Sequence, residues 1–94
     1  MAQTNFFVHD KQDHVGVAVT DIKAGEDVSG WVMEDNSTVT VKSQNDIPLG
    51  HKIALYDLDQ GAKVLKYNVV IGKASQAVKK GEHMHTHNLR TLRW

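Results

Sequence analysis

Asp46-Ile-Pro-Leu-Gly50-His-Lys-Ile53 is one of four segments in this chain that share one order: an apolar residue, two variable residues, glycine, two variable residues and a second apolar residue. The others are Asp21-Ile-Lys-Ala-Gly25-Glu-Asp-Val28, Asp57-Leu-Asp-Gln-Gly61-Ala-Lys-Val64 and Ala77-Val-Lys-Lys-Gly81-Glu-His-Met84. Glycine at positive φ allows a tight turn, and the flanking apolar side chains then point into a core. Such corners predict a compact, barrel-like coil of short strands. Glycine-centred turns occur in any β protein, so this plainer interpretation of the repeat stays open.

Alternating apolar and polar residues between the corners indicate half-buried strands. Together with β-branched and aromatic composition, the alternation predicts strands at 6–8, 15–19, 38–41, 52–56 and 64–71. No stretch carries apolar residues at helical spacing over three turns, so we expect at most one short helical turn, at Ala74–Val78 and closed by Gly81. The expected fold class is therefore mostly β, in a single domain over residues 1–94.

Charge and residue usage exclude several classes of function. The 94 residues include 11 basic and 11 acidic side chains, so the chain lacks the basic surplus that nucleic-acid binding requires. The absence of cysteine excludes disulfides, thiolate metal sites and a cysteine nucleophile. The N-terminus does not resemble a signal peptide, and no apolar run approaches the roughly 18 residues of a membrane span. We expect a cytoplasmic chain that binds neither nucleic acid nor membrane.

The densest group of chemically competent side chains lies in Gly81-Glu-His-Met-His-Thr-His-Asn88. In an extended segment its three histidines would share one face, where they could bind one divalent metal ion or exchange protons with one substrate. A bend between His85 and Asn88 would break that face. The alternative without a function is a solvent-exposed edge strand that happens to carry histidines.

Two weaker groups lie elsewhere in the sequence. His51 and Lys52 follow Gly50 at a turn, where they could bind a carboxylate and exchange protons, although an ordinary polar corner is the alternative. The pairs His9-Asp10 and Asp13-His14 could equally be surface residues. Nucleotide-binding, serine-hydrolase and zinc-protease motifs are all missing, and a chain this short seldom encloses a cavity of roughly 300 Å³. A complete active site is therefore expected to need a second chain.

These segments, taken in order, resemble the SAF-type domain at the N-terminus of altronate and galactarate dehydratases. The resemblance spans about residues 7–88 and rests on His9-Asp10 with Asp13, Gly50-His-Lys-Ile-Ala-Leu55, Lys66-Tyr-Asn-Val-Val-Ile-Gly72 and Gly81-Glu-His-Met-His-Thr-His-Asn88. It implies a β-clip fold of short bent strands. In those dehydratases the domain continues into a catalytic core, whereas this chain stops at Trp94. The resemblance therefore implies a free-standing small subunit with a large catalytic partner subunit.

The resemblance further implies a lyase that eliminates sulfite from (2R)-3-sulfolactate, a small anionic substrate, to give pyruvate. Its alternatives are an altronate-type dehydratase that eliminates water and a non-catalytic carbohydrate-binding module. A divalent metal, Fe²⁺, is implied, held by this chain or by the partner. The family motif His-x-His-Asn matches residues 85–88 and leaves His83 outside. The residues implied are His51, Lys52, His85 and His87 as catalytic, Asn88 and His9 as substrate-binding, and His85 and His87 as metal ligands.

Overall fold

The structure, a computed structural model, describes residues 4–10, 12–66, 69–85 and 87–91, and all their regular elements are strands. This confirms the mostly β prediction. Within these ranges no helix is long and apolar enough to cross a membrane. The strands are β1 (Thr4–Val8), β2 (Val15–Ala18), β3 (Asp27–Val32), β4 (Ser37–Lys42), β5 (Lys52–Ala54), β6 (Lys63–Lys66), β7 (Val69–Ala74), β8 (His83–Met84) and β9 (Leu89–Thr91).

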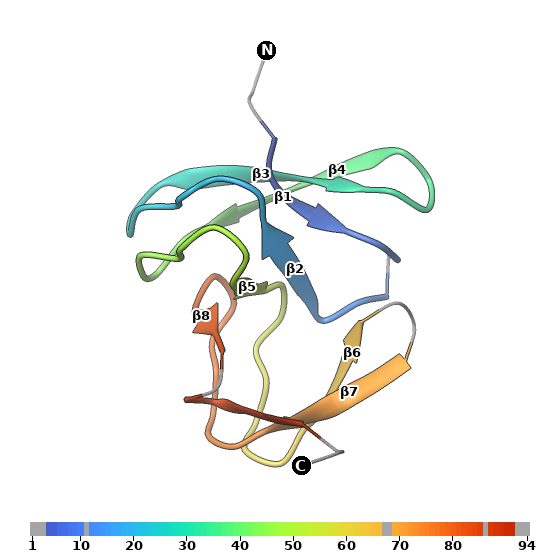
Figure 1. The fold of residues 1–94 in the computed structure, drawn as a ribbon, viewed down its shortest axis with the longest axis vertical. Coiled ribbons are helices and arrows are strands. Elements are labelled where there is room, and N and C mark those ends of the chain that lie inside the picture. The colour runs from blue at the N-terminus through green and yellow to red at the C-terminus, as the bar shows by residue number, and fades with distance from the viewer. Residues whose placement is uncertain (1–3, 11, 67–68, 86, 92–94) are drawn as a thin grey trace.

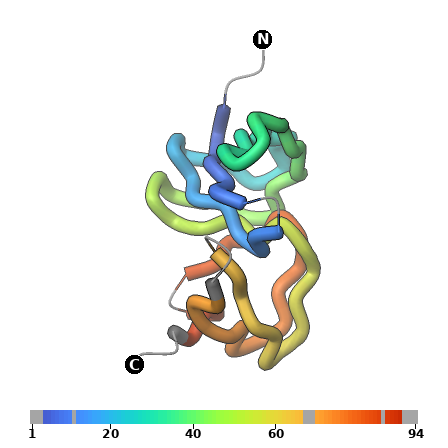
Figure 2. The backbone as a smooth tube through the Cα atoms, turned by 90° about the vertical axis from the view of Figure 1, so that its right-hand side faces the viewer, coloured from blue at the N-terminus to red at the C-terminus, as the bar shows by residue number. Residues whose placement is uncertain are grey.

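The strands form two sheets, one above the other in Figure 1. The six-stranded sheet has the order β4-β3-β1-β2-β5-β8, and the three-stranded sheet has the order β6-β7-β9. Only the β1–β3 pair is parallel among the described pairings. Figure 2 shows the same division as an N-terminal part, blue to green, above a C-terminal part, yellow to red.

Each part has its own apolar core, and three strands connect the two cores. The first core centres on Phe6, which is fully buried, and the second includes Val64 and Val78. Val15 of β2, Ala54 of β5 and Met84 of β8 belong to the second core although their strands lie in the first sheet. The two parts therefore share β2, β5 and β8, which fixes β5 and β8 between the cores.

The four corners have the predicted backbone. The φ angles of their glycines lie between 86° and 89°. In each corner the residue after glycine donates its N–H to the carbonyl three residues earlier, at 2.9 to 3.3 Å, which closes a β-turn. Isolated antiparallel bridges join Ile22 to Ile47 and Leu58 to Val78, so the corners pair as first with second and third with fourth. All eight flanking apolar residues are buried: Ile22, Val28, Ile47, Ile53, Leu58, Val64, Val78 and Met84.

Two expectations about secondary structure were wrong. The helical turn at 74–78 is absent because Ala74 N donates to Ala62 O and Val78 N donates to Leu58 O, which are long-range bonds rather than helical ones. The expected strand 64–71 is instead two antiparallel strands, β6 and β7, and residues 67–68 between them lie outside the described part.

Three strands, β3, β8 and β9, had no sequence prediction; in β3 the reason is that Gly30 interrupts the apolar alternation. The fold needs glycine there: a Cβ at Gly30 or at Gly16 would collide with the ring of Phe6. Gly30 therefore breaks the apolar pattern of β3 and at the same time leaves room for Phe6, the largest side chain of the first core.

Candidate functional site

Aspartate side chains brace the corners across each pair. The bonds run from Leu49 N to Asp21 Oδ1 (2.9 Å), from Ala24 N to Asp46 Oδ1 (2.9 Å) and from Lys80 N to Asp57 Oδ1 (2.8 Å). The corners of Gly25 and Gly50 therefore brace each other in both directions. The equivalent position in the fourth corner holds Ala77, which has no carboxylate, so the corners of Gly61 and Gly81 are braced by an aspartate in one direction only.

In two corners a glutamate accepts a backbone N–H of its own corner. The second corner lacks the N–H that such a glutamate would accept. The bonds run from Lys23 N to Glu26 Oε1 (2.7 Å) and from Lys79 N to Glu82 Oε1 (2.6 Å). In the second corner the donor position holds Pro48, which has no N–H to satisfy. The residue after glycine is glutamate in the first and fourth corners, Ala62 in the third and His51 in the second.

Four imidazoles gather where this corner meets β8, the strand labelled at the left of Figure 1. The pairing of β5 with β8 brings the two segments together. His51 Nδ1 lies 2.8 Å from His83 Nε2, so one of these nitrogens donates to the other. The rings of His51 and His85 stack with centroids 3.8 Å apart and planes at 17°, and the ring of His87 lies 5.0 Å from that of His83. Residues far apart in sequence therefore form one cluster, the histidine cluster, of His51, His83, His85 and His87.

Asn88 shapes the loop that carries three of these histidines. Its Oδ1 accepts a hydrogen bond from His85 N (2.9 Å), and its Nδ2 donates to His83 O (2.8 Å). The backbone N–H groups of Asn88 and Leu89 both donate to His85 O, so the chain turns after β8. The single extended face is broken, yet this turn places His87 near His83. Asn88, only 4% exposed, thus positions the loop, and its contact with substrate stays a prediction.

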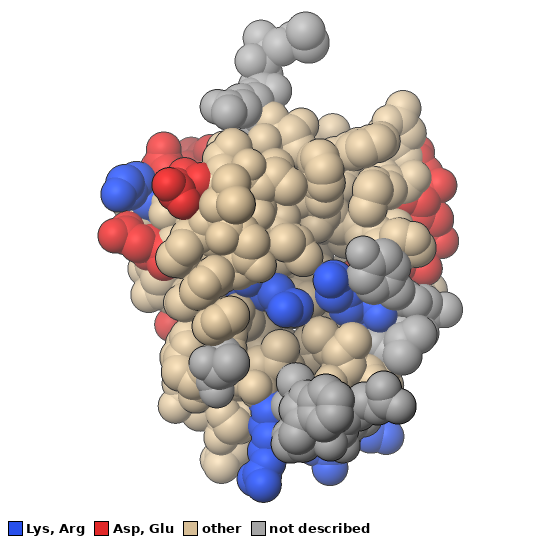
Figure 3. All heavy atoms as spheres, viewed as in Figure 1, with Lys and Arg blue, Asp and Glu red and all other residues tan. Residues whose placement is uncertain are grey.

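Burial and neighbouring basic groups lower three pKa values in or beside the cluster. Burial, and then the charge of Lys66, lowers the pKa of Lys52. Partial burial, and then the neighbouring imidazoles, lowers the pKa of His83. Partial burial, His51 and Lys52 lower the pKa of His85. On the face shown in Figure 3, basic side chains gather across the middle and at the base, and acidic ones lie mainly toward the sides. The site therefore combines imidazoles of lowered pKa with a lysine beside His85.

The histidine cluster does not by itself make a complete metal centre. Nowhere in the described ranges do three His, Asp or Glu side chains converge as metal ligands would. The reason is geometric: His51 and His83 bond to each other through ring nitrogens, and His51 stacks on His85 rather than facing a common point with it. His85 and His87 as metal ligands stay a prediction.

The N-terminal His/Asp pairs lie apart from this cluster. His14 Nδ1 accepts a hydrogen bond from Leu65 N (3.1 Å), and the fully buried Asp13 accepts one from Asp10 N (3.2 Å). Asp10 Oδ1 accepts a further bond from Gln12 N (3.0 Å), so both pairs include a structural residue. His9 follows β1, whose end lies on the opposite side of Figure 1 from β8. The role of His9 in substrate binding stays a prediction that this arrangement does not favour.

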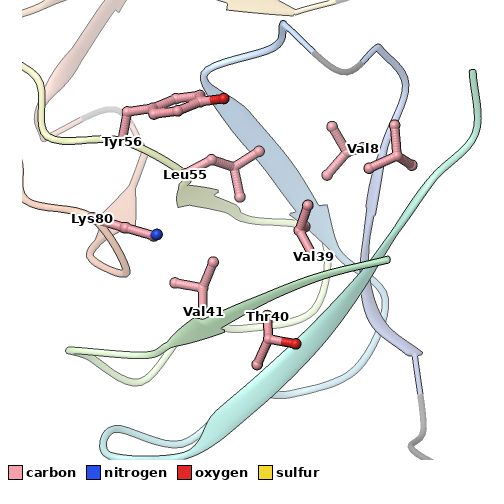
Figure 4. Close-up of a pocket in the computed structure, with 8 residues that line it drawn as sticks. Val8, Val39, Thr40, Val41, Leu55, Tyr56 and Lys80 are labelled. Atoms are coloured by element: carbon pink, nitrogen blue, oxygen red, sulfur yellow. The ribbon is translucent and has the colours of Figure 1, made fainter. Parts of the chain in front are cut away.

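Two hollows differ in chemistry. One, of about 130 Å³, lies between β4 and the segment after β5, and Figure 4 shows Val39 and Val41 facing Leu55, with Tyr56 and Lys80 nearby. Its apolar walls offer little acid–base chemistry. The other, of about 320 Å³, adjoins the histidine cluster. This polar hollow is lined by Asn45, Gln76, Ala77, Glu82, His83, His87 and Asn88.

Sequence reasoning left one member of the cluster out of the site. His83 was excluded because the family motif begins at His85, although the regular spacing of the three histidines was a signal for it. His51, His85 and His87 were identified, and the structure brings them together with Lys52 beside His85.

Comparison with known proteins identifies relatives with two different names. The chain is 44% identical over 91 residues to the (2R)-sulfolactate sulfo-lyase subunit alpha of Chromohalobacter salexigens, covering 96% of this chain and 97% of that one. It is 46% identical over 63 residues to the subunit alpha of the same name from Paracoccus pantotrophus, covering 67% and 94%. It is also 44% identical over 79 residues to the altronate dehydratase of Escherichia coli, of which it spans only 15%.

The family comparison covers nearly the whole chain. Residues 4–92 match the family described as altronate/galactarate dehydratase SAF domain. This match confirms the resemblance inferred from the corners and from the histidine segment. The chain belongs to the altronate/galactarate dehydratase SAF domain family.

Proposed function

We propose that this chain is the small subunit of a lyase that eliminates sulfite from (2R)-3-sulfolactate and yields pyruvate. Two relatives matched over nearly their full length are named as alpha subunits of such an enzyme. The observation that carries the chemistry is the contact of His51 with His83 and His85. It places several proton-exchanging groups at one point of a chain that otherwise consists of short strands and turns.

The reaction requires a base and a place for negative charge. A base removes the C2 proton, the electron pair of that bond forms the C2–C3 double bond, and sulfite leaves C3 with the electrons of the C–S bond. The enolpyruvate that results takes up a proton at C3 and loses its hydroxyl proton to become pyruvate. Lys52 and His85 suit the role of base, because a lowered pKa increases the fraction of each that is neutral near pH 7. We propose that His51 and His83, whose ring nitrogens are bonded to each other, pass a proton between them.

The rest of the active site is proposed to come from a partner. The alpha designation of both relatives implies a second subunit, and we propose that this large catalytic subunit closes over the histidine cluster. The divalent ion, Fe²⁺, is proposed to be held mainly by that subunit, because the imidazoles described here do not form a complete centre. The absence of cysteine supports the cytoplasm as the compartment.

A second candidate is elimination of water by an altronate-type enzyme. Altronate dehydratases of Escherichia coli and Bacillus subtilis match 84% and 86% of this chain. In this alternative the chain acts as a separate N-terminal subunit of a sugar-acid dehydratase. The same base chemistry applies, with hydroxide rather than sulfite as the leaving group.

Purification of the native complex tests the proposal. The chain is purified with its partner, the partner is identified by mass spectrometry, and the complex is assayed with sulfolactate and with altronate. Sulfite and pyruvate from sulfolactate are the expected products. A 2-keto-3-deoxy sugar acid from altronate, without sulfite release, would establish the second candidate instead. Failure to turn over either substrate would leave the chain a binding module.

A further inference from the structure

Ala77 interrupts the bracing pattern at one corner. Three corners carry aspartate immediately before their first apolar residue, and each aspartate accepts a backbone N–H from the paired corner. By the same pairing, a carboxylate at position 77 would accept the N–H of Gln60, just as Asp57 accepts that of Lys80. Alanine therefore forgoes a hydrogen bond that the fold offers at this position.

The interruption lies in the wall of the polar hollow. Ala77 lines the hollow together with the imidazoles of His83 and His87 and the side-chain amides of Gln76 and Asn45. Asn45 Oδ1 accepts a hydrogen bond from His83 N (2.9 Å), which orients its amide. Imidazole and amide N–H groups are donors to anions.

Negative charge is nearly absent from this wall. Among the described residues that line the hollow, Glu82 alone has a carboxylate, and its Oε1 accepts a hydrogen bond from Lys79 N (2.6 Å). An aspartate at position 77 would add a second carboxylate beside the two imidazoles. The charge of that aspartate would repel an anion bound in the hollow, and the repulsion is strong where water is partly excluded.

We infer that the polar hollow binds a small anionic group, a sulfonate or a carboxylate, and that Ala77 determines this specificity by keeping a second carboxylate out of the wall. The inference rests on the proposed function for the identity of the anion, because sulfolactate carries both groups. Three observations point to the hollow as the binding site: its N–H donors, the hydrogen bond that Glu82 already makes to Lys79 N, and the missing aspartate at position 77. The hydrogen bond that an aspartate would accept is therefore missing at a corner position that lines the hollow.

Two variants separate charge from size. Ala77→Asp adds the carboxylate, and Ala77→Asn adds nearly the same volume without charge. Methanesulfonate and lactate, which carry one group each, are titrated into the full chain while backbone and side-chain amide NMR signals are recorded. We expect one or both anions to shift the signals of Gln76, Ala77 and Asn88. Ala77→Asp should weaken binding at least tenfold and Ala77→Asn by less than about threefold, with both melting temperatures equal to or above that of the wild type.

The assembled enzyme provides the second readout. Ala77→Asp should raise KM for sulfolactate at least tenfold and leave kcat within about threefold, because the lost interaction is one of binding. Unchanged KM and unchanged anion titrations in Ala77→Asp would overturn the inference, even in a complex that releases sulfite. A complex that releases no sulfite would overturn the proposed function, while anion binding lost in Ala77→Asp would still support the inference.

Discussion

The two pairs of corners follow one plan with different regularity. In the N-terminal pair, around Gly25 and Gly50, aspartates brace each corner from the other. In the C-terminal pair, around Gly61 and Gly81, only one such brace exists, since Ala77 replaces the second aspartate. Two departures from the plan, at His51 and at Ala77, lie at the histidine cluster or in the hollow beside it. A third, Ala62 in place of glutamate after Gly61, packs against the second core instead. The comparison indicates that the regular positions serve the fold and that two of the three irregular ones lie at the candidate site.

The glycines differ in a second way. A Cβ on Gly25, Gly50 or Gly61 would meet nothing within 4 Å, whereas a Cβ on Gly81 would collide with the carbonyl of Lys42. The corner that precedes the histidine loop therefore packs against β4 at Gly81, and the other three corners have open space beside their glycines.

Gly81→Ala should produce the largest effect on stability. A non-glycine residue at positive φ costs about 1–3 kcal/mol, and the collision with Lys42 adds to it, so we expect a loss above about 3 kcal/mol. Gly25→Ala, at the same φ but in open space, is the matched control and should cost about 1 kcal/mol. Urea unfolding of both variants measures the difference. Equal losses would show that the contact with β4 does not distinguish the corners.

The histidines should show the largest effect on activity. We expect His51→Ala, His85→Ala and His87→Ala each to lower kcat/KM of the assembled enzyme at least roughly a hundredfold, the scale of a lost acid–base or ligand group. His83→Ala should cost about tenfold, because His83 positions His51 through the 2.8 Å bond between their rings. Steady-state kinetics decides this, with assembly checked by gel filtration. A loss at His83 equal to that at His85 would favour three equivalent histidines, and full activity in the other variants would make the loop a docking element.

Removing one aspartate from each pair of corners compares how much the braces stabilise the two pairs. Asp46→Ala removes the acceptor of Ala24 N and should destabilise the chain by about 1 kcal/mol, the net value of a typical hydrogen bond. Asp57→Ala removes the only aspartate brace of the C-terminal pair and should cost slightly more, because no reciprocal bond remains there. Urea unfolding midpoints measure both. A neutral result for both variants would mean that the braces do not stabilise the corners.

The smallest expected effect is a dependence of stability on pH. The pKa values of His83 and His85 are lowered in the folded chain, so the unfolded chain binds protons more readily. Stability should therefore be complete above the ordinary histidine pKa of about 6.5 and decrease as the pH falls below it. Unfolding at pH 7.5 and 5.5 measures this, and replacing both histidines by glutamine should flatten the dependence. Stability that rises on acidification would contradict the sign.

Pattern and motif predicted much of the fold and part of the site. The corners were visible because glycine at positive φ leaves a fixed spacing between buried apolar residues. β3 was missed because Gly30 packs against the ring of Phe6. This contact between strands cannot be read from the alternation of residues. His83 was left out for a similar reason: its partner His51 lies in another corner, and no local motif joins the two.

The amino-acid sequence by itself determined the turns, the mostly β class and the residue types able to exchange protons, since each depends on neighbours a few positions away. Only the tertiary structure decided which of those residues meet. The pairing of β5 with β8 set His51 against His83 and His85, the turn closed by Asn88 brought His87 back, and the pairing of the corners showed that Ala77 occupies an aspartate position. These are contacts between distant segments, and they form because burying two apolar cores leaves the chain one way to bring its corners together.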